Sequence, residues 1–367
     1  MAAYRDRVSV IGVGFDIACG NAAIRTNLTV ADLGATEQES THRLNELADT
    51  IHGTVSFGVG RSNRANDAPV DHALFDAPAW DAVPAKHRGT LRDKARSQLG
   101  TVGSGNHYVD VFADEAGTLW VGVHFGSRGF GHTVASGFLA LGQNADWGQR
   151  VPEKEVLLPV GQPLGHDYWH LMSLAGEYAY AGREWVARKV VELLGGREEE
   201  LVHNHHNFAW REVHDGQELV VVRKGATPAF PGQKGFIGGS MGDDAVIVRG
   251  TLPDHADDAT KQAQQDALFS TVHGAGRVMS RTAAAGKRNR RTGAVLRPGL
   301  VTPEMLQSWV REKGVVLRGG GLDESPHAYR RLPDVLRAQG DTIEVLHTLK
   351  PLIVVMAGAN EFDPYRD

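Results

Sequence analysis

Short apolar runs separated by polar and glycine-rich stretches recur along the chain. Runs rich in Val, Ile and Leu that stay apolar or alternate with polar positions over about four to eight residues are typical of β-strands. The segments with this pattern are residues 8–13, 54–59, 118–124, 218–223, 245–248, 343–348 and 352–355. We expect these to be strands, and the first of them leads directly into a glycine-rich segment, residues 12–20.

Helical periodicity is clearest over residues 170–194, where apolar residues stand at positions 171, 174, 175, 178, 185, 186, 190 and 193. Gly195 and the glycine after it are expected to end this helix. A second helix is predicted to begin at Pro303 with Thr302 as its N-cap and to end at Gly314. Two less regular segments, residues 261–269 and 332–338, are also predicted to be helical.

The order of these elements favours an α+β fold. Strands and helices do not alternate in a regular βαβ rhythm, which a doubly wound parallel sheet would require. There is no internal repeat, and 367 residues are enough for a large core. We therefore expect a single large domain over residues 1–367, with mixed β-sheets and surrounding helices.

The chain carries no sign of a membrane or secretory protein. No apolar run approaches the ~20 residues that span a bilayer, and the N-terminus lacks the apolar core of a signal peptide. The single cysteine cannot form an internal disulfide, which favours a reducing compartment. The expected location is the cytoplasm, without a membrane partner.

Charge and composition narrow the functional classes. The net charge of −5 argues against a protein that coats nucleic acid non-specifically, but a local basic groove remains compatible with it. The only charge-dense run, residues 287–291, is either a solvated loop or a phosphate-binding loop. The chain also has 44 glycines and 17 histidines, so the histidines are informative only where they cluster.

Two short segments in the N-terminal half of the chain combine glycines with side chains that can bind metal ions. Asp16 and Cys19 lie three residues apart in a glycine-rich turn, where they could converge on one or two metal ions. A lone cysteine is otherwise a small buried hydrophobe. Residues 100–107 form a glycine-rich loop that ends in Asn106 and His107 and offers backbone N–H groups to a phosphate. The alternative is a tight turn before a strand.

Further histidines stand at strand ends or in turns. His124 closes the predicted strand 118–124 and is followed by glycines, so it is either a ligand or a structural histidine bonded to backbone. Residues 203–207 contain three histidines and two asparagines, and at least one of the histidines is expected to be a ligand. His273 lies in a flexible turn, with arginines four and eight residues later.

Phosphate-binding residue types accompany these histidines. Residues 223–226 and 238–242 combine a cation, a hydroxyl group and bare glycine backbone, which suits phosphate oxygens. Asp, Cys and His together suit a two-metal centre of borderline-soft type. One cysteine cannot build a structural zinc finger. The sequence therefore predicts a metal-dependent enzyme that acts on phosphate esters.

These segments resemble the RtcB family of RNA ligases. The resemblance is carried, in the family order, by DIACG (16–20), GTVGSGNHYVDV (100–111), HFGSRG (124–129), HHN (205–207), RKGA (223–226), GSMG (239–242), HGAGRVMSR (273–281) and SPHAYR (325–330). It implies a catalytic domain around a metal-containing cleft. It also implies an enzyme that joins a 2′,3′-cyclic phosphate or 3′-phosphate RNA end to a 5′-hydroxyl end, with GTP and Mn²⁺.

The resemblance also implies residue roles. Cys19 would bridge two manganese ions, with His107 and His124 completing one site and Asp16 and His206 the other. His273 would be the nucleophile that takes GMP from GTP. An imidazole with an ordinary pKa of ~6.5 is largely neutral at pH 7–8, as a nucleophile must be. The positions that would contact the nucleotide are Asn106, Asp110, Ser240, His273, Gly274, Gly276 and Tyr329.

The chain departs from the family pattern at several places. Family members carry an additional segment ahead of DIACG, with its own His- and Gly-rich motif. Asp110 stands where the family usually has a glutamate that binds the guanine edge, and Gly239 replaces a common proline. The family ends in Lys-Gly, where this chain has Ala357 and Gly358 before residues 359–367.

Because of these departures, two other functions stay open. One is a manganese phosphodiesterase that opens cyclic phosphates without ligation, and the other is an RNA-end-binding protein. An intact His273 favours the ligase. The local basic surface expected to bind RNA comprises Arg128, Arg277, Arg281 and residues 287–291. An activating partner protein is also possible for a ligase of this kind.

Overall fold

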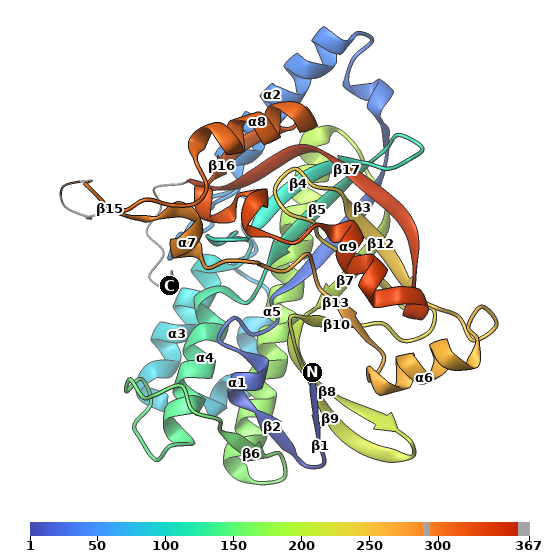
Figure 1. Cartoon of the computed structure of the whole chain (residues 1–367). Coiled ribbons are helices and arrows are strands. Elements are labelled where there is room, and N and C mark those ends of the chain that lie inside the picture. Colours follow the sequence, from blue (N-terminus) through green and yellow to red (C-terminus); the bar gives the residue numbers. More distant parts are fainter. Residues whose placement is uncertain (289–291, 293, 359–367) are drawn as a thin grey trace.

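A computed structural model describes residues 1–288, 292 and 294–358 of the chain. Its centre is an eight-stranded sheet whose strands pair in the order β11-β12-β17-β4-β5-β3-β7, with β16 parallel to β17 (Figure 1). The strands of this sheet are β3 (Gly20–Thr29), β4 (Tyr108–Ala113), β5 (Thr118–Phe125), β7 (Glu198–His205), β11 (Lys234–Ile237), β12 (Ala245–Gly250), β16 (Val316–Gly320) and β17 (Ile343–Gly358). The other neighbours in this order pair antiparallel.

The sheet curls until its two ends, β11 and β7, come together. The Phe236 N–H in β11 donates to the side-chain oxygen of Asn204 in β7 at 3.0 Å. The amide of Asn21 in β3 donates to the Phe236 carbonyl at 2.8 Å. Side-chain amides thus replace part of the backbone hydrogen bonding that would join β11 to β7. The inner face of the curled sheet packs around the buried rings of Phe112 and Trp120.

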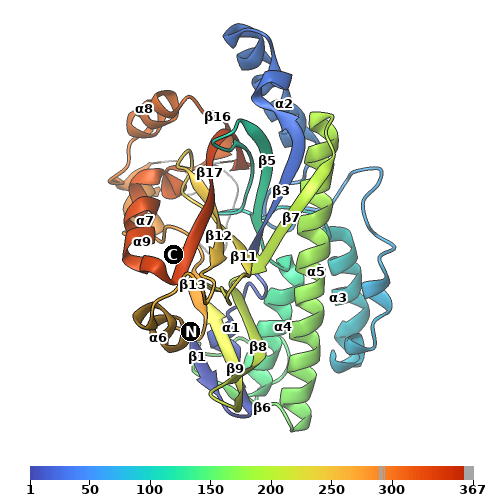
Figure 2. The same cartoon turned by 90° about the vertical axis from the view of Figure 1, so that its right-hand side faces the viewer.

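Helices cover the outer face and the lower end of this sheet (Figure 2). The helices of the fold are α1 (Val10–Val13), α2 (Glu37–Thr54), α3 (Ala85–Gln98), α4 (Arg128–Leu141), α5 (Pro163–Leu194), α6 (Asp258–Asp266), α7 (Arg281–Ala285), α8 (Pro303–Lys313) and α9 (Leu332–Gln339). Helix α5 runs the length of the molecule and packs Val186 and Val190 on the sheet, beside Leu47 and Ile51 of α2. Below the sheet, α5 shares a second apolar core with α1, α3 and α4.

The remaining strands form small sheets around the main one. They are β1 (Ala2–Tyr4), β2 (Arg7–Ser9), β6 (Leu157–Pro159), β8 (Asn207–His214), β9 (Gln217–Lys224), β10 (Ala226–Pro228), β13 (Ser270–Val272), β14 (Lys287–Arg288) and β15 (Val295–Arg297). The β8–β9 hairpin, with β1 at its edge, reaches away from the main sheet at the lower end in Figure 1. No helix among the described residues has the length and apolar character needed to cross a membrane.

Helices packed beside a large mixed sheet confirm the predicted α+β fold. Strands were predicted correctly at β5, β9 and β12, and segments 343–348 and 352–355 are two parts of the single strand β17. The last four residues of segment 8–13 are instead the short helix α1, because the Ser9 hydroxyl caps it by accepting from the Gly12 N–H at 2.8 Å. The strand predicted at 54–59 is wrong, since α2 continues to its start and Phe57 makes only an isolated bridge.

The helix predictions succeed where end signals are strong. Helix α8 has the predicted Thr302 cap, Pro303 start and left-handed Gly314 end, and α5 ends at a left-handed Gly195 but begins earlier, at Pro163. Helices α6 and α9 confirm the two weaker predictions to within a few residues. Helices α2, α3 and α4 are absent from the prediction, because α2 and α3 are mostly polar and α4 is rich in glycine.

Candidate active site

The register of three neighbouring strand pairs brings the expected ligands to one end of the sheet. Gly20 at the start of β3 pairs with Phe125 at the end of β5 and with His205 at the end of β7. Tyr108 at the start of β4 pairs with His124. Cys19, His107, His124 and His206 stand at or next to these positions, and Asp16 lies four residues before Gly20. Segments more than a hundred residues apart in sequence therefore converge. We call the five residues Asp16, Cys19, His107, His124 and His206 the donor cluster.

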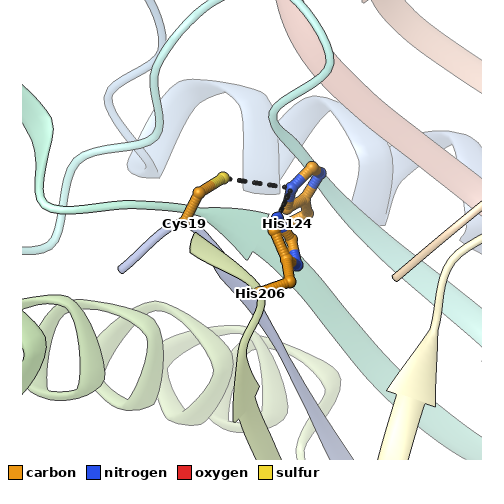
Figure 3. A group of neighbouring side chains, drawn as sticks. All are labelled: Cys19, His124 and His206. Atoms are coloured by element: carbon orange, nitrogen blue, oxygen red, sulfur yellow. Dashed lines mark hydrogen bonds between the residues drawn. The ribbon is translucent and has the colours of Figure 1, made fainter. Parts of the chain in front are cut away.

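One group of donors is formed by Cys19, His124 and His206, all buried (Figure 3). The Cys19 sulfur lies 3.3 Å from Nε2 of His124, and that nitrogen lies 3.3 Å from Nε2 of His206. The three donor atoms point toward one another from the loop before β3, the end of β5 and the residue after β7. Donor atoms at such separations could share one metal ion.

A second group shares the same sulfur. It consists of Asp16, Cys19 and His107, with Nε2 of His107 lying 3.1 Å from the Asp16 carboxylate and 3.7 Å from the Cys19 sulfur. These two groups differ from the expected pairing of His107 with His124 and of Asp16 with His206. His107 precedes β4, next to the Asp16 side of the loop, whereas His124 and His206 lie on the far side of Cys19. The bridging position expected for Cys19 fits this geometry.

The second ring nitrogens have contacts that orient the rings. Nδ1 of His124 donates to the Asn106 carbonyl at 3.0 Å, which leaves Nε2 free to face the cluster. The Arg128 guanidinium lies 3.3 Å from Nδ1 of His107. Nδ1 of His206 is buried without a hydrogen-bond partner among the described residues. A buried imidazole left this way is typical of a site that is completed by another group.

The cluster has the electrostatics of a cation site. Burial lowers the pKa of both His124 and His206 well below the usual range, so both rings are neutral near pH 7. Burial opposes ionisation of Asp16, but the hydrogen bond and charge of His107 outweigh it and lower the pKa of the carboxyl to about 2. Burial and then Asp16 raise the pKa of Cys19 well above its usual range. A thiolate here would need a nearby cation, and neutral imidazoles, thiolate and carboxylate form a donor set that fits divalent metal ions.

His273 stands directly after β13, beside the donor cluster. Its ring centroid lies 4.7 Å from that of His206. Burial lowers the pKa of His273, against a hydrogen bond to the Gly225 backbone, so the ring is neutral near pH 7. A neutral imidazole next to a candidate metal site is a competent nucleophile.

A cavity of about 260 Å³ opens next to His273, and we call it the central cavity. It is lined by all the positions expected to contact a nucleotide: Asn106, Asp110, Ser240, His273, Gly274, Gly276 and Tyr329. The Ser240 hydroxyl donates to Asp243 at 2.8 Å, and the Tyr329 hydroxyl contacts Glu324 and accepts from Arg277 at 2.9 Å. The structure therefore brings these residues together around one cavity, and their contact with a nucleotide stays a prediction.

Asp110 differs from the other lining residues. Its side chain comes from β4, it is 7% exposed, and its Oδ1 has no hydrogen-bond partner among the described residues. Burial raises the pKa of the carboxyl well above its usual range, although the Val355 backbone opposes this. Ala357, where the resemblance places the family lysine, is buried in β17 and packs in the core with Val355, outside the lining of the central cavity.

A second hollow, the side cleft, opens on the Asp16 and His107 side of the cluster. Its volume is about 860 Å³, and Asn106 and Arg281 line both it and the central cavity. Its cationic lining residues are Lys94, Arg128, Arg150 and Arg281. Arg128 and Arg281 were expected to belong to a basic surface, whereas Arg277 lies in the central cavity. Lys287 and Arg288 form β14, and residues 289–291 of the charged run lie outside the described residues.

Sequence reasoning misses two buried charged residues of the site. Glu324 is buried between Arg277 and Arg281, at 3.2 and 3.0 Å. Its place directly before the SPHAYR segment is the only sequence signal for it. Arg183 lies in the middle of α5, where its long side chain would ordinarily be assigned to a solvated helix face. Only the structure shows that it points inward.

Comparison with known proteins gives the family of the chain. The family model described as tRNA-splicing ligase RtcB matches residues 1–357. The chain is 31% identical to the RNA-splicing ligase RtcB of Escherichia coli K12, over 94% of this chain and 82% of that protein. It is 32% identical to the tRNA-splicing ligase RtcB of Archaeoglobus fulgidus, over 90% and 77%. A protein matched over nearly its whole length by this family model belongs to the RtcB family of RNA ligases.

Proposed function

We propose that this RNA ligase joins a 2′,3′-cyclic phosphate or 3′-phosphate RNA end to a 5′-hydroxyl end, with GTP as cosubstrate and two Mn²⁺ ions. The observation that carries the proposal is the Cys19 sulfur shared by two donor groups, with His273 between them and the central cavity. A shared thiolate is the simplest way for five ligands to hold two ions close together.

The ions would be held by Cys19, with His124 and His206 on one side and Asp16 and His107 on the other. When bound, they would neutralise charge that develops on phosphate oxygens. These ligands alone do not select manganese, because Zn²⁺ binds more tightly than Mn²⁺ to most nitrogen and sulfur donors. Metal analysis of protein purified without chelators is the direct test of the metal.

The chemistry assigned to His273 is nucleophilic. Its neutral ring attacks the α-phosphorus of GTP, the bond to the β-phosphate oxygen breaks, and pyrophosphate leaves. A 3′-phosphate oxygen of RNA then attacks the same phosphorus and displaces the imidazole. The 5′-hydroxyl of the second RNA end loses its proton, attacks the RNA phosphorus and displaces GMP. A cyclic phosphate end must first be opened by water to a 3′-phosphate.

The side cleft is the proposed path of RNA. Its cations lie next to Asp16 and His107, and Asn106 and Arg281 connect it with the central cavity. Lys and Arg along such a cleft suit a phosphate backbone. The base and the triphosphate of GTP would then occupy the central cavity, on the other side of the donor cluster.

The test is covalent labelling with GTP in the presence of Mn²⁺. Label from [α-³²P]GTP is expected to stay on the denatured protein, whereas label from [γ-³²P]GTP leaves with pyrophosphate. His273→Ala is the matched control and should abolish labelling without changing metal content. Labelling that survives in this variant contradicts the assigned nucleophile. Adding cell extract to the same reaction tests the need for an activating protein.

A phosphodiesterase without ligation is the second candidate, favoured by one feature of the central cavity. Asp110 lines this cavity with a shorter side chain than the glutamate of the family pattern, so guanine would have a weaker polar contact there. If no nucleotide labels the protein, but a 2′,3′-cyclic phosphate end is opened with Mn²⁺, this second function is correct. If the protein only retains RNA ends, it is an RNA-end-binding protein.

A further inference from the structure

Arg183 is a fully buried cation directly behind the donor cluster. It lies in α5 with an exposure of 0%, although arginine is almost never fully buried without an acidic partner. One guanidinium nitrogen donates to the Ala18 carbonyl at 2.9 Å and to the Phe125 carbonyl at 2.6 Å. Nε donates to His203 at 2.9 Å, and the other terminal nitrogen donates to Nδ1 of His205 at 2.9 Å.

Three of these acceptors are direct neighbours of candidate ligands. Ala18 precedes Cys19, Phe125 follows His124, and His205 precedes His206. One side chain therefore connects the loop, the strand end and the segment that supply the group drawn in Figure 3. We propose that Arg183 is a positioning residue that sets the spacing of Cys19, His124 and His206. This inference rests on the metal part of the proposed function.

The loop that carries Cys19 needs such support. Ala18 has φ of 60°, a left-handed conformation that is strained for a residue with a Cβ. Its N–H donates to the Asn207 carbonyl at 2.7 Å and its carbonyl accepts from Arg183, so both backbone groups are fixed. A Cβ at Gly20 would lie 2.2 Å from the Asn204 carbonyl oxygen, so β3 and β7 approach closely here. The bond from Arg183 thus holds a conformation that the loop would not adopt alone.

The partners of Arg183 point to geometry rather than stability as its role. Within the part of the chain that the structure describes, all four acceptors are neutral, two carbonyls and two imidazoles. Burying a guanidinium without a bonded carboxylate is costly, and apolar side chains of similar volume commonly stabilise a core better. An apolar residue cannot replace the guanidinium group, because it lacks the several N–H donors that this planar group presents at fixed angles.

Lysine cannot replace this fork either. Its ammonium group is a single point on a flexible stem and cannot reach two carbonyls and two imidazoles on different segments at once. Arg183→Lys keeps the positive charge but loses most of the geometry. Arg223 belongs to a segment that was expected to bind phosphate, but its equally buried guanidinium donates to Glu212, Ser270 and the Leu268 carbonyl and lines neither hollow. It therefore offers a matched control. Arg223→Lys makes the same chemical change at a site without candidate ligands.

The experiment loads the full-length protein with Co²⁺ as a spectroscopic probe. Wild type is expected to show a thiolate-to-cobalt charge-transfer band, and Arg183→Lys a shifted or weaker band. We expect its affinity for Co²⁺ to fall ~10–100-fold, as for other groups that orient metal ligands. Arg223→Lys should keep the wild-type band even if its thermal unfolding temperature falls as much. An unchanged band and affinity in Arg183→Lys overturn the inference.

A wild-type protein without the charge-transfer band would instead refute the metal part of the proposed function, and the inference with it. If Arg183→Lys does not fold, two variants at His205 replace it. His205→Leu removes the acceptor of one guanidinium N–H, whereas Asn can place its Oδ1 near the former Nδ1. We expect weaker Co²⁺ binding in His205→Leu than in His205→Asn. Equal binding by these two variants overturns the inference.

Discussion

The donor cluster and the central cavity adjoin one another but differ in how their polar groups are held. In the cluster, His124 is oriented by the Asn106 carbonyl, the Cys19 loop is held by Arg183, and the donor atoms face one another. In the cavity, Asp110 has a buried oxygen without a partner among the described residues, and the lining residues from β17, Val354 and Met356, are apolar. Metal chemistry depends on positions within a fraction of an ångström, whereas base recognition tolerates a lost contact at a cost of about 1–3 kcal/mol.

The largest effect is expected from the residue that both donor groups share. Cys19→Ala removes one ligand from each group, so we expect it to lose both ions and to lower ligation more than about a hundredfold, beyond the usual effect of an orienting residue. Metal content measured by mass spectrometry, together with RNA joining, checks this. For metal content, His132→Ala is a suitable control, because His132 lines the side cleft without belonging to either donor group. A Cys19→Ala protein that retains two ions would show that the sulfur is not a bridge.

The sequence predicts the cluster better than the elements that carry it. Asp16, Cys19, His107, His124 and His206 lie in short glycine-rich or histidine-rich segments whose order matches the family, and the structure brings them together. Their division into two groups depends on strand register, which puts Tyr108 opposite His124 and Gly20 opposite His205. Pairing across a curled sheet is a long-range property, so local patterns do not reveal it.

The same limit explains the elements and contacts that the sequence does not predict. Helix α3 buries little more than Leu91 and Ala95, so its apolar stripe is too narrow to recognise. An arginine in a helix is usually assigned to the solvent-exposed face. Arg183 is instead a buried hydrogen-bond donor, because α5 packs against the ends of β5 and β7. In contrast, α8 is predicted with its correct ends because capping by Thr302 and Gly314 is a local signal.

Asp110→Glu is predicted to restore guanine selectivity in the central cavity. A carboxylate can accept from the N1–H and N2–H edge of guanine, and adenine offers no such pair of donors. The shorter Asp110 side chain is expected to reduce the preference for GTP over ATP by roughly tenfold, equivalent to about 1.4 kcal/mol. Covalent labelling of His273 with the four nucleoside triphosphates measures this. Equal selectivity of wild type and Asp110→Glu would show that the substitution has no effect.

His203, which accepts a hydrogen bond from Arg183 behind the donor cluster, should make the stability of the protein depend on pH. Burial lowers the pKa of His203 to about 3, against the hydrogen bond to Glu184. The unfolded chain, with an ordinary pKa of ~6.5, then binds more protons between about pH 3 and 6.5, so the free energy of unfolding falls as pH decreases through this range. One such group contributes up to ~1.4 kcal/mol per pH unit. Urea unfolding of metal-free protein at several pH values should show a shallower slope for His203→Gln, and an unchanged slope would contradict this.

The smallest predicted effect tests whether RNA follows the side cleft rather than the central cavity. Arg150 is exposed at the edge of this cleft, so Arg150→Ala should remove about one phosphate contact. For single-stranded RNA this lowers the slope of log affinity against log salt by ~0.7, with a modest loss of affinity at low salt. Arg43→Ala, on the exposed side of α2 and outside both hollows, is the matched control. The contrast between the two variants, measured by fluorescence anisotropy over a salt series, distinguishes a backbone contact from a general change of charge. If both variants keep the wild-type slope, the side cleft is not the path of the RNA backbone at Arg150.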